Sequence, residues 1–366
     1  MDSNWISANY EYLQLPIHIK CDNKYFQELK DRYDRILTAF NSTELSILSH
    51  FSNQILESIT AYYKNNTIES YELIHNLLLD LSKDPCSSLC FSKLKDCAIP
   101  KTRKGDSQFF RAREGTSYIE YPANEMGYVP FEQRTKCAEN RYSLAGIPCL
   151  YLGNTSYVCW LEMNRPSDDK FCVSPFYIDS DLSFFNIAIP IFRLKEAIDR
   201  NRRDEFMFLM KAYLLEIATS FCIEQSDRHF HSEYIVSQNI MKSCIRQKQN
   251  GIIFYTTRAV DNLLSLVCGI NIALYIDFND NEKKSIIFEE KTEHGDSVNY
   301  AMFKNLLSCQ NCERYNLAVD QSDFIANIGN IDNQIKYSET QFHEFDNYIF
   351  THWKRAKDKA KIMNNN

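Results

Sequence analysis

The stretch that decides the fold runs from Arg141 to Glu162 and reads RYSLAGIPCLYLGNTSYVCWLE. Residues 147–152 form a short apolar run, which predicts a buried strand. A hydroxyl side chain at position 155 or 156 can cap a helix that carries Glu162. We therefore expect a strand–turn–helix unit that brings an arginine, a tyrosine (Tyr151) and a glutamate together.

The three side chains suit a ligand that contains phosphate and sugar. Arg141 offers a planar fork of donors that matches phosphate oxygens. Glu162 can hold ribose hydroxyls and favour a cationic, oxocarbenium-like transition state, as carboxylates do in glycoside hydrolysis. The ring of Tyr151 can stack on a flat nicotinamide. Cleavage of a dinucleotide such as NAD needs such a set, although residue types alone favour a surface salt bridge with Tyr151 in the core.

The composition is that of a globular protein with more than one domain. The chain has 366 residues, of which 44% are hydrophobic and 24% charged, enough for two or three domains. Only 9 Gly and 9 Pro argue against a long flexible linker or bulk disorder. The net charge of −7 argues against a general nucleic-acid surface, because counterion release needs concentrated positive charge. We therefore expect no nucleic-acid partner.

The cysteines and the apolar pattern predict a cytoplasmic protein with no membrane partner. The 13 cysteines are odd in number and spread through apolar stretches, which is typical of buried free thiols in a reducing compartment. The first residues lack a basic segment followed by an apolar run, so no signal peptide is expected. The longest apolar run, 263–276, is too short to span a bilayer.

Residues 1–100 are predicted to form a helical module. Apolar residues recur at helical spacing between positions 23 and 83, which indicates three helices. Asn41 and Glu44 resemble a capping box that starts the second helix, and Asn66 is expected to start the third. No catalytic pattern occurs in this module, so packing or the docking of a partner is the expected role.

The rest of the chain predicts an α+β fold, because strands and helices do not alternate as a regular βαβ repeat. Residues 279–366 are expected to form a C-terminal appendage with a charged final helix at 345–361. The expected strands are 109–113, 147–152, 171–178, 182–187, 251–255 and 271–275. Residues 194–223 are expected to be mostly helical, and a helix is expected at 235–246.

The central stretch resembles the signature of the RES-domain family, which is named for Arg, Glu and Ser. In that family an arginine turn precedes a Gly-x-Pro-Val-Leu-Tyr-Leu strand and then a helix that ends in Glu, as between Arg141 and Glu162. Four further elements match in order: FRAR at 110–113, YIVSQ at 234–238, NGIIFY at 250–255 and NIALY at 271–275. The resemblance covers residues 107–278, the expected catalytic domain.

The resemblance implies a fold similar to that of ADP-ribosyltransferase toxins and an enzyme that degrades NAD. Many members are toxins of RES–Xre toxin–antitoxin pairs. The family's functional residues correspond to Arg141, Tyr151, Glu162 and Ser237, and Arg111 matches the arginine of the opening strand. By this resemblance, Arg141 and Arg111 would hold the diphosphate, with a structural contact as the other role for Arg111. Tyr151 would position the nicotinamide, and Glu162 would orient the ribose. Ser237 would form a hydrogen bond to the nicotinamide or to its ribose.

NAD would then be a substrate, with water, phosphate or a protein side chain as the acceptor. Neither a cofactor nor a metal is expected, and the phosphate-loop patterns GxGxxG and GxxxxGK[ST] do not occur. Two alternatives stay open: ADP-ribosylation of a protein target, and an inactive RES core that serves as an interaction protein. An antitoxin or a sensor protein could bind the helical regions, and a homo-oligomer is compatible with the sequence.

Three other motifs favour ordinary explanations. Cys309-Gln-Asn-Cys312 has zinc-knuckle spacing, but a structural zinc site needs a second pair of ligands. His229 and His231 precede Ser237 and could line a pocket or act as a base, although a structural pair is favoured. The basic residues at 200–203 fit a solvated loop or helix start better than a nucleic-acid patch.

Overall fold

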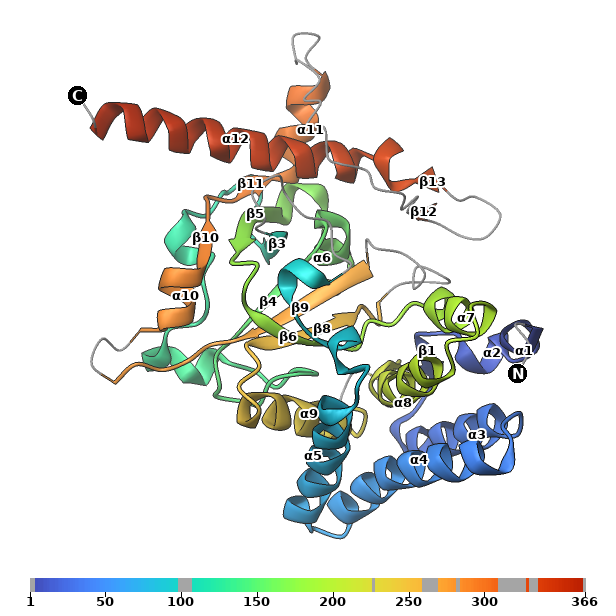
Figure 1. Cartoon of the computed structure of the whole chain (residues 1–366). Helices are drawn as coiled ribbons and strands as arrows, with labels where there is room; N and C mark the ends of the chain where they lie inside the picture. The colour runs from blue at the N-terminus through green and yellow to red at the C-terminus, as the bar shows by residue number, and fades with distance from the viewer. Residues whose placement is uncertain are drawn as a thin grey trace. The chain divides into compact units, whose positions relative to one another are not determined.

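The computed structural model describes residues 4–97, 107–225, 228–258, 269–280, 284–308, 327–328 and 335–364. For 4, 107, 308, 327–328, 335–336 and 354–364 it describes the backbone alone. The described part combines helices and sheet strands in an irregular order, so the predicted α+β class is confirmed (Figure 1).

Contacts divide the chain into two compact units, each assembled from separate stretches. The first unit comprises Met1–Lys93, Arg134–Ile147 and Ser183–Thr257. The second unit comprises Leu94–Gln133, Pro148–Leu182 and Arg258–Asn366. Both units draw on the middle of the chain, so they cut across the predicted ranges 1–100, 107–278 and 279–366.

The N-terminal part of the first unit is helical. Its helices are α1 (Asn4–Ala8), α2 (Tyr10–Leu13), α3 (Tyr25–Leu37), α4 (Ser42–Tyr63) and α5 (Thr67–Lys83). The predicted starts of α4 and α5 are confirmed: the Asn41 side chain accepts a hydrogen bond from the Glu44 N–H at 3.0 Å, and Asn66 accepts one from the Glu69 N–H at 3.2 Å. Each cap satisfies one backbone donor that a helix start leaves without a partner.

Helix α8 (Arg203–Thr219) is the buried centre of the first unit. The hydroxyl of Tyr33 donates to the Leu214 carbonyl at 2.6 Å, and that of Tyr25 to the Ala218 carbonyl at 2.9 Å, so α3 is tied to α8. The other elements of this unit are α7 (Ile191–Asp199), α9 (Tyr234–Arg246), β1 (Ile17–Ile19), β2 (Phe91–Lys93), β6 (Ser183–Asn186), β7 (Phe221–Ile223) and β8 (Gly251–Tyr255). Strand β6 pairs in parallel with β8 and antiparallel with β2.

The prediction that residues 194–223 are mostly helical is confirmed, with two interruptions. The chain turns between α7 and α8, where Asn201 has a φ of 54°, a left-handed conformation that asparagine adopts more readily than most residues. Residues 221–223 form β7, which pairs in parallel with β1 from Ile17 opposite Phe221. Tertiary strand pairing therefore overrides the helical pattern at this end.

The second unit is built on an antiparallel sheet with the strand order β10-β5-β3-β4-β9. The strands are β10 (Thr292–His294), β5 (Phe171–Ile178), β3 (Ser107–Glu114), β4 (Cys149–Gly153) and β9 (Ile270–Tyr275), and β11 (Val298–Asn299) also pairs with β5. A further pair is formed by β12 (Asn327–Ile328) and β13 (Ile335–Lys336). The strands predicted at 109–113, 147–152, 171–178 and 271–275 are confirmed within two residues at each end.

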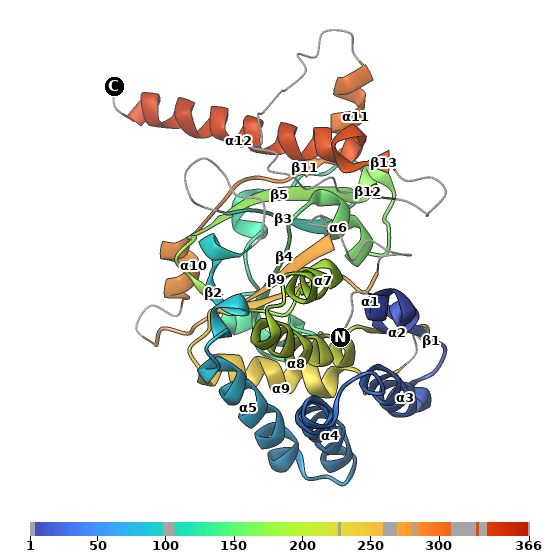
Figure 2. The same cartoon turned by 45° about the vertical axis from the view of Figure 1, so that its right-hand side comes forward.

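The C-terminal region supplies part of the core of the second unit. Its helices are α10 (Ile286–Lys291), α11 (Tyr300–Ser308) and α12 (Gln341–Asn364). Phe303 of α11 and Phe345 of α12 are almost fully buried together with Phe171 and Val173 of β5. Helix α12 contacts both β5 and α6 (Ser156–Glu162), and it lies beside them in the views of Figure 1 and Figure 2.

The turn from β4 into α6 is so tight that it requires a glycine. A Cβ atom on Gly153 would lie 2.3 Å from Cγ1 of Val158 and 2.8 Å from Sγ of Cys159, both on α6. The helix then starts at Thr155, whose hydroxyl accepts a hydrogen bond from the Val158 N–H at 3.1 Å. The predicted strand–turn–helix is thus confirmed.

Gly153→Ala is expected to lower the free energy of unfolding by about 1–3 kcal/mol, the usual cost of forcing extra atoms into a packed site. Urea unfolding measures this change. The matched control is Gly115→Ala, because a Cβ there would meet its nearest neighbours at 3.4 Å. Equal stability of the two variants would show that α6 does not pack on β4 as described.

Candidate functional site

The residues predicted to form the site are distributed over both units. Arg141 and Ser237 belong to the first unit, and Arg111, Tyr151 and Glu162 belong to the second. Within the second unit, Asn271 contacts Glu162 and is a neighbour of Tyr151 on the sheet. The sequence interpretation did not assign Asn271 to the site.

Glu162 is the last residue of α6, and its carboxylate is held by an amide. The Nδ2 of Asn271 donates to Oε1 of Glu162 at 2.6 Å. Asn271 is buried in β9, whereas Glu162 is exposed. A buried amide donor therefore orients an accessible carboxylate.

Tyr151 lies on the same face of the sheet as Asn271. In the antiparallel pairing of β4 with β9, Tyr151 is opposite Ala273 and Gly153 is opposite Asn271. Directly paired residues share a face, so Asn271 occupies the diagonal position next to Tyr151, at a separation of about 7–8 Å. Tyr151 is partly buried on this face. Asn271 thus holds the carboxylate of Glu162 and has Tyr151 as its diagonal neighbour on the sheet.

Arg111 has a structural partner. Its Nη1 donates to the carbonyl of Gly127, in the segment that follows β3. Burial, as the largest cause, and the charge of Arg113 lower the pKa of Arg111 to about 10. The guanidinium therefore stays protonated at neutral pH. Of the two roles predicted for Arg111, the described contact is the structural one.

In the first unit, Arg141 is held by two backbone carbonyls and two aromatic rings. Nη1 donates to the Thr219 carbonyl at 3.1 Å and Nη2 to the Tyr255 carbonyl at 2.6 Å. The guanidinium carbon lies 4.4 Å from the ring centre of Phe254 and 5.2 Å from that of Tyr142. Thr219 ends α8, so a positive charge is favourable there. Two of the five N–H donors of a guanidinium are used by these carbonyls.

Ser237 is fully buried in α9. Its hydroxyl donates to the carbonyl of Tyr234, one turn earlier in the same helix, at 3.1 Å. The next residue, Gln238, is partly exposed and donates through Nε2 to Oε1 of Glu139 at 2.6 Å. Gln238 of this helix therefore contacts the segment that carries Arg141. It lies in the YIVSQ stretch but was assigned no role from the sequence.

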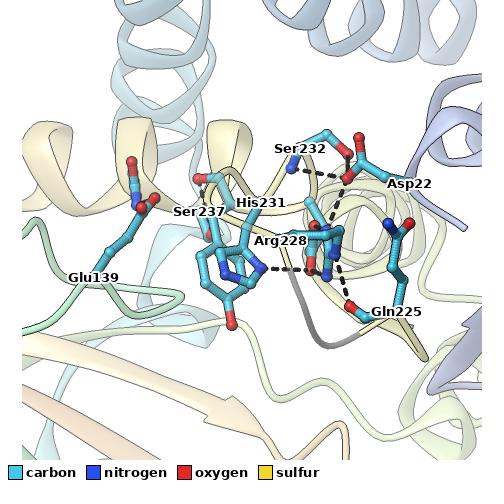
Figure 3. A network of polar contacts seen from close by, with 10 residues as sticks. Asp22, Glu139, Gln225, Arg228, His231, Ser232 and Ser237 are labelled. Carbon is cyan, nitrogen blue, oxygen red and sulfur yellow. Dashed lines mark hydrogen bonds and ion pairs between the residues drawn. The ribbon is translucent and has the colours of Figure 1, made fainter.

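A polar network orders the segment before α9 (Figure 3). Arg228 donates to both carboxylate oxygens of Glu233, at 2.9 and 2.8 Å, and to Asp22 at 2.8 Å. The hydroxyl of Ser232 donates to Asp22 at 2.6 Å, and Nδ1 of His231 lies 3.5 Å from Glu233. These contacts fit the structural interpretation of His231.

A buried carboxylic acid near Arg141 had no signal in the sequence, because it lies inside the apolar pattern of α8. Glu216 is 2% exposed, and burial raises its pKa well above the usual range. The Ile189 N–H donates to Oε2 at 3.2 Å and, like the charge of Arg141, opposes that rise. Oε1 has no hydrogen-bond partner among the described residues.

Glu216→Gln is expected to change how stability depends on pH. In the wild type the raised pKa means that the folded state binds a proton more tightly than the unfolded state, whose pKa is about 4.3. The stability from this group is therefore complete below about pH 4.3 and is lost as pH rises, by up to about 1.4 kcal/mol per pH unit. Between pH 5 and 8 the free energy of unfolding should therefore fall more steeply with pH in the wild type than in the variant. If the free energy of unfolding depended on pH in the same way in both proteins, Glu216 could not be neutral in the folded state.

No group of three or more His, Cys, Asp or Glu side chains suited to a metal ion occurs within the described ranges. Cys309 and Cys312 lie outside those ranges. None of the helices in the described part of the chain is both long and apolar enough to cross a membrane.

Comparisons with known proteins add one sequence relative. No family model matches the chain. The chain is 25% identical over 228 residues to a protein of Bacillus subtilis (strain 168) named "Putative toxin YopC". The match covers 60% of this chain and 50% of the relative, so this chain spans about half the length of that protein. The relative is larger than the part that matches, and its name refers to the whole protein.

Among solved structures, the chain was matched to the M. tuberculosis MbcT–MbcA toxin–antitoxin complex. The match has a TM-score of 0.27 and 12% identity, over 56% of this chain and 90% of that chain. A score this low does not establish a common fold.

Proposed function

We propose that this chain is a toxin-class enzyme that cleaves the nicotinamide–ribose bond of NAD. The toxin assignment is supported by the similarity to the Bacillus subtilis protein over 228 residues. The choice of NAD is supported by the resemblance of the Arg141–Glu162 stretch to the RES signature. An antitoxin partner and a cytoplasmic location are part of the same proposal.

The observation that carries the proposal is the hydrogen bond from Asn271 to Glu162, next to Tyr151 on one sheet face. Cleavage of a glycosidic bond to ribose builds positive charge on the sugar, and a fixed carboxylate stabilises that charge. With Oε1 held by Asn271, Oε2 of Glu162 is directed to the ribose hydroxyls or the anomeric carbon.

Tyr151 would position the leaving group. Its ring gives a flat surface on which the nicotinamide stacks, which aligns the scissile bond with the carboxylate. Nicotinamide leaves as a neutral molecule once the bonding electron pair moves onto its ring nitrogen, so the chemistry needs no proton on the leaving group. The acceptor is water, phosphate or a protein side chain.

Arg141 and Ser237 keep the roles that the resemblance gives them, as contacts to the diphosphate and to the nicotinamide or its ribose. The fixed guanidinium of Arg141 is compatible with anion binding, because a ligand would meet a donor that is already ordered. Substitution of either residue tests the first unit separately from Glu162.

Purified protein is expected to release nicotinamide from NAD, and Glu162→Gln should lower that rate about 10²–10³-fold, the usual effect of removing one group that stabilises transition-state charge. Chromatography of the products measures the release. The matched control is Glu290→Gln, which changes the same charge at an exposed position of α10 in the same unit. If both variants lost the same fraction of the release rate, the loss would not come from the proposed site.

Two further readouts separate the alternatives. NAD labelled in its adenylate part reports transfer: label on a protein would favour ADP-ribosylation, and free ADP-ribose or its phosphate would favour depletion of NAD. Growth arrest of a bacterial host by the wild type, and not by Glu162→Gln, would support a toxin. NAD binding without turnover by the wild type would contradict the enzyme proposal and favour the interaction protein.

A further inference from the structure

The start of α6 is bound by a carboxylate from the C-terminal helix. The N–H of Ser156, the first residue of α6, donates to Oδ1 of Asp346 at 3.0 Å. The hydroxyl of Tyr337 donates to Oδ2 of the same carboxylate at 2.6 Å. Asp346 is 8% exposed, and Ser156 and Tyr337 are buried as well. This is a buried contact between α6 and a residue 190 positions later in the chain.

Apolar packing holds the carboxylate in place. Phe345, Ile349 and Phe350 of α12 are nearly fully buried in the core of the second unit, with Cys159 of α6 in the same cluster. The rings of Phe350 and Phe110 of β3 are 5.0 Å apart in an edge-on arrangement. The face of α12 that carries Asp346 is therefore fixed to α6 and to the sheet.

Helix α6 depends on such contacts because it is short. It has 7 residues, about two turns, and isolated helices of this length are unstable in water. At about 1.5 Å of rise per residue, Glu162 at its end lies roughly 9 Å along the axis from Ser156. Asp346 holds the first residue of the helix and Asn271 holds the last. A carboxylate also interacts favourably with the positive N-terminal end of the helix.

We propose that Asp346 is a positioning residue for Glu162: through the N–H of Ser156 it fixes α6, and so the carboxylate that faces the ribose. The proposal rests on the proposed function for the role of Glu162. Asp346 itself does not touch the reacting atoms. The C-terminal helix thereby becomes part of the catalytic apparatus.

The ionisation of Asp346 falls in an accessible range. Burial raises its pKa to about 7, and the hydrogen bonds from Ser156 and Tyr337 oppose the rise. The groups on other elements that sense its charge are Cys159 on α6 and Tyr300 on α11, and burial keeps the pKa of each well above 7. On its own helix, burial lowers the pKa of His343, and Glu344 is exposed. Asp346 is thus a group whose charge changes near neutral pH.

Charged and neutral Asp346 differ in strength as partners of Ser156. The ionised carboxylate makes the stronger bond to a backbone N–H. Positioning of Glu162 should therefore improve as pH rises through about 7. The sign for stability is opposite: the stability linked to this group is complete below the unfolded pKa of about 3.9 and is lost as pH rises to about 7.

The test compares Asp346→Asn with Glu344→Gln, which removes a charge from an exposed position of the same helix. For Asp346→Asn we expect kcat for nicotinamide release to fall about 10–100-fold, the scale of a small misplacement, with KM for NAD within about twofold. The rise of kcat through pH 7 should disappear. Glu344→Gln should match the wild type in all three respects. A wild-type kcat and pH profile in Asp346→Asn would overturn the proposal.

Hydrogen exchange of the amides of residues 156–159 gives a readout that needs no turnover. Faster exchange in Asp346→Asn, but not in Glu344→Gln, is expected, and unchanged exchange would overturn the positioning role even if NAD proved not to be the substrate. Should Asp346→Asn fail to fold, Tyr337→Phe removes only the second donor to the carboxylate. That variant should show a smaller loss of kcat than Asp346→Asn. An unchanged kcat in Tyr337→Phe would count against the proposal.

Discussion

The close approach of α6 to the end of β4 at Gly153 is the constraint on which the second unit depends. Gly153 is paired with Phe110 of β3 and with Asn271 of β9, so it lies where three strands meet. A side chain at this position would collide with Val158. Glycine therefore allows α6 to begin after only Asn154 and Thr155. That geometry places Glu162, at the far end of α6, within hydrogen-bond distance of Asn271.

In both units, charged side chains hold backbone groups in place. Arg141 joins the last carbonyl of α8 to the last of β8, and Arg111 binds the carbonyl of Gly127. Asp346 does the converse for the first N–H of α6. A guanidinium offers the same planar set of donors to carbonyls and to phosphates. A sequence motif that selects arginine therefore does not distinguish a structural contact from a ligand contact.

Local features were predictable from the sequence, and long-range contacts were not. The cap at Asn41 and the strand that contains Tyr151 follow from patterns within a few residues, and both are confirmed. Strand β7, at the end of the mostly helical stretch 194–223, was not predicted, because its partner strand β1 lies some 200 residues away. Glu216 and Asp346 carried no signal, since their burial depends on tertiary packing. The roles of the site residues on NAD stay predictions.

The decisive measurement is a crystal structure of Glu162→Gln with NAD, because the amide keeps the size of the side chain while turnover is slowed. The account predicts that the ribose hydroxyls next to nicotinamide lie within about 3.2 Å of the side chain at position 162. The nicotinamide ring should stack on Tyr151, and Asn271 should still contact residue 162. NAD bound elsewhere on the protein, with these three side chains unoccupied, would contradict the account.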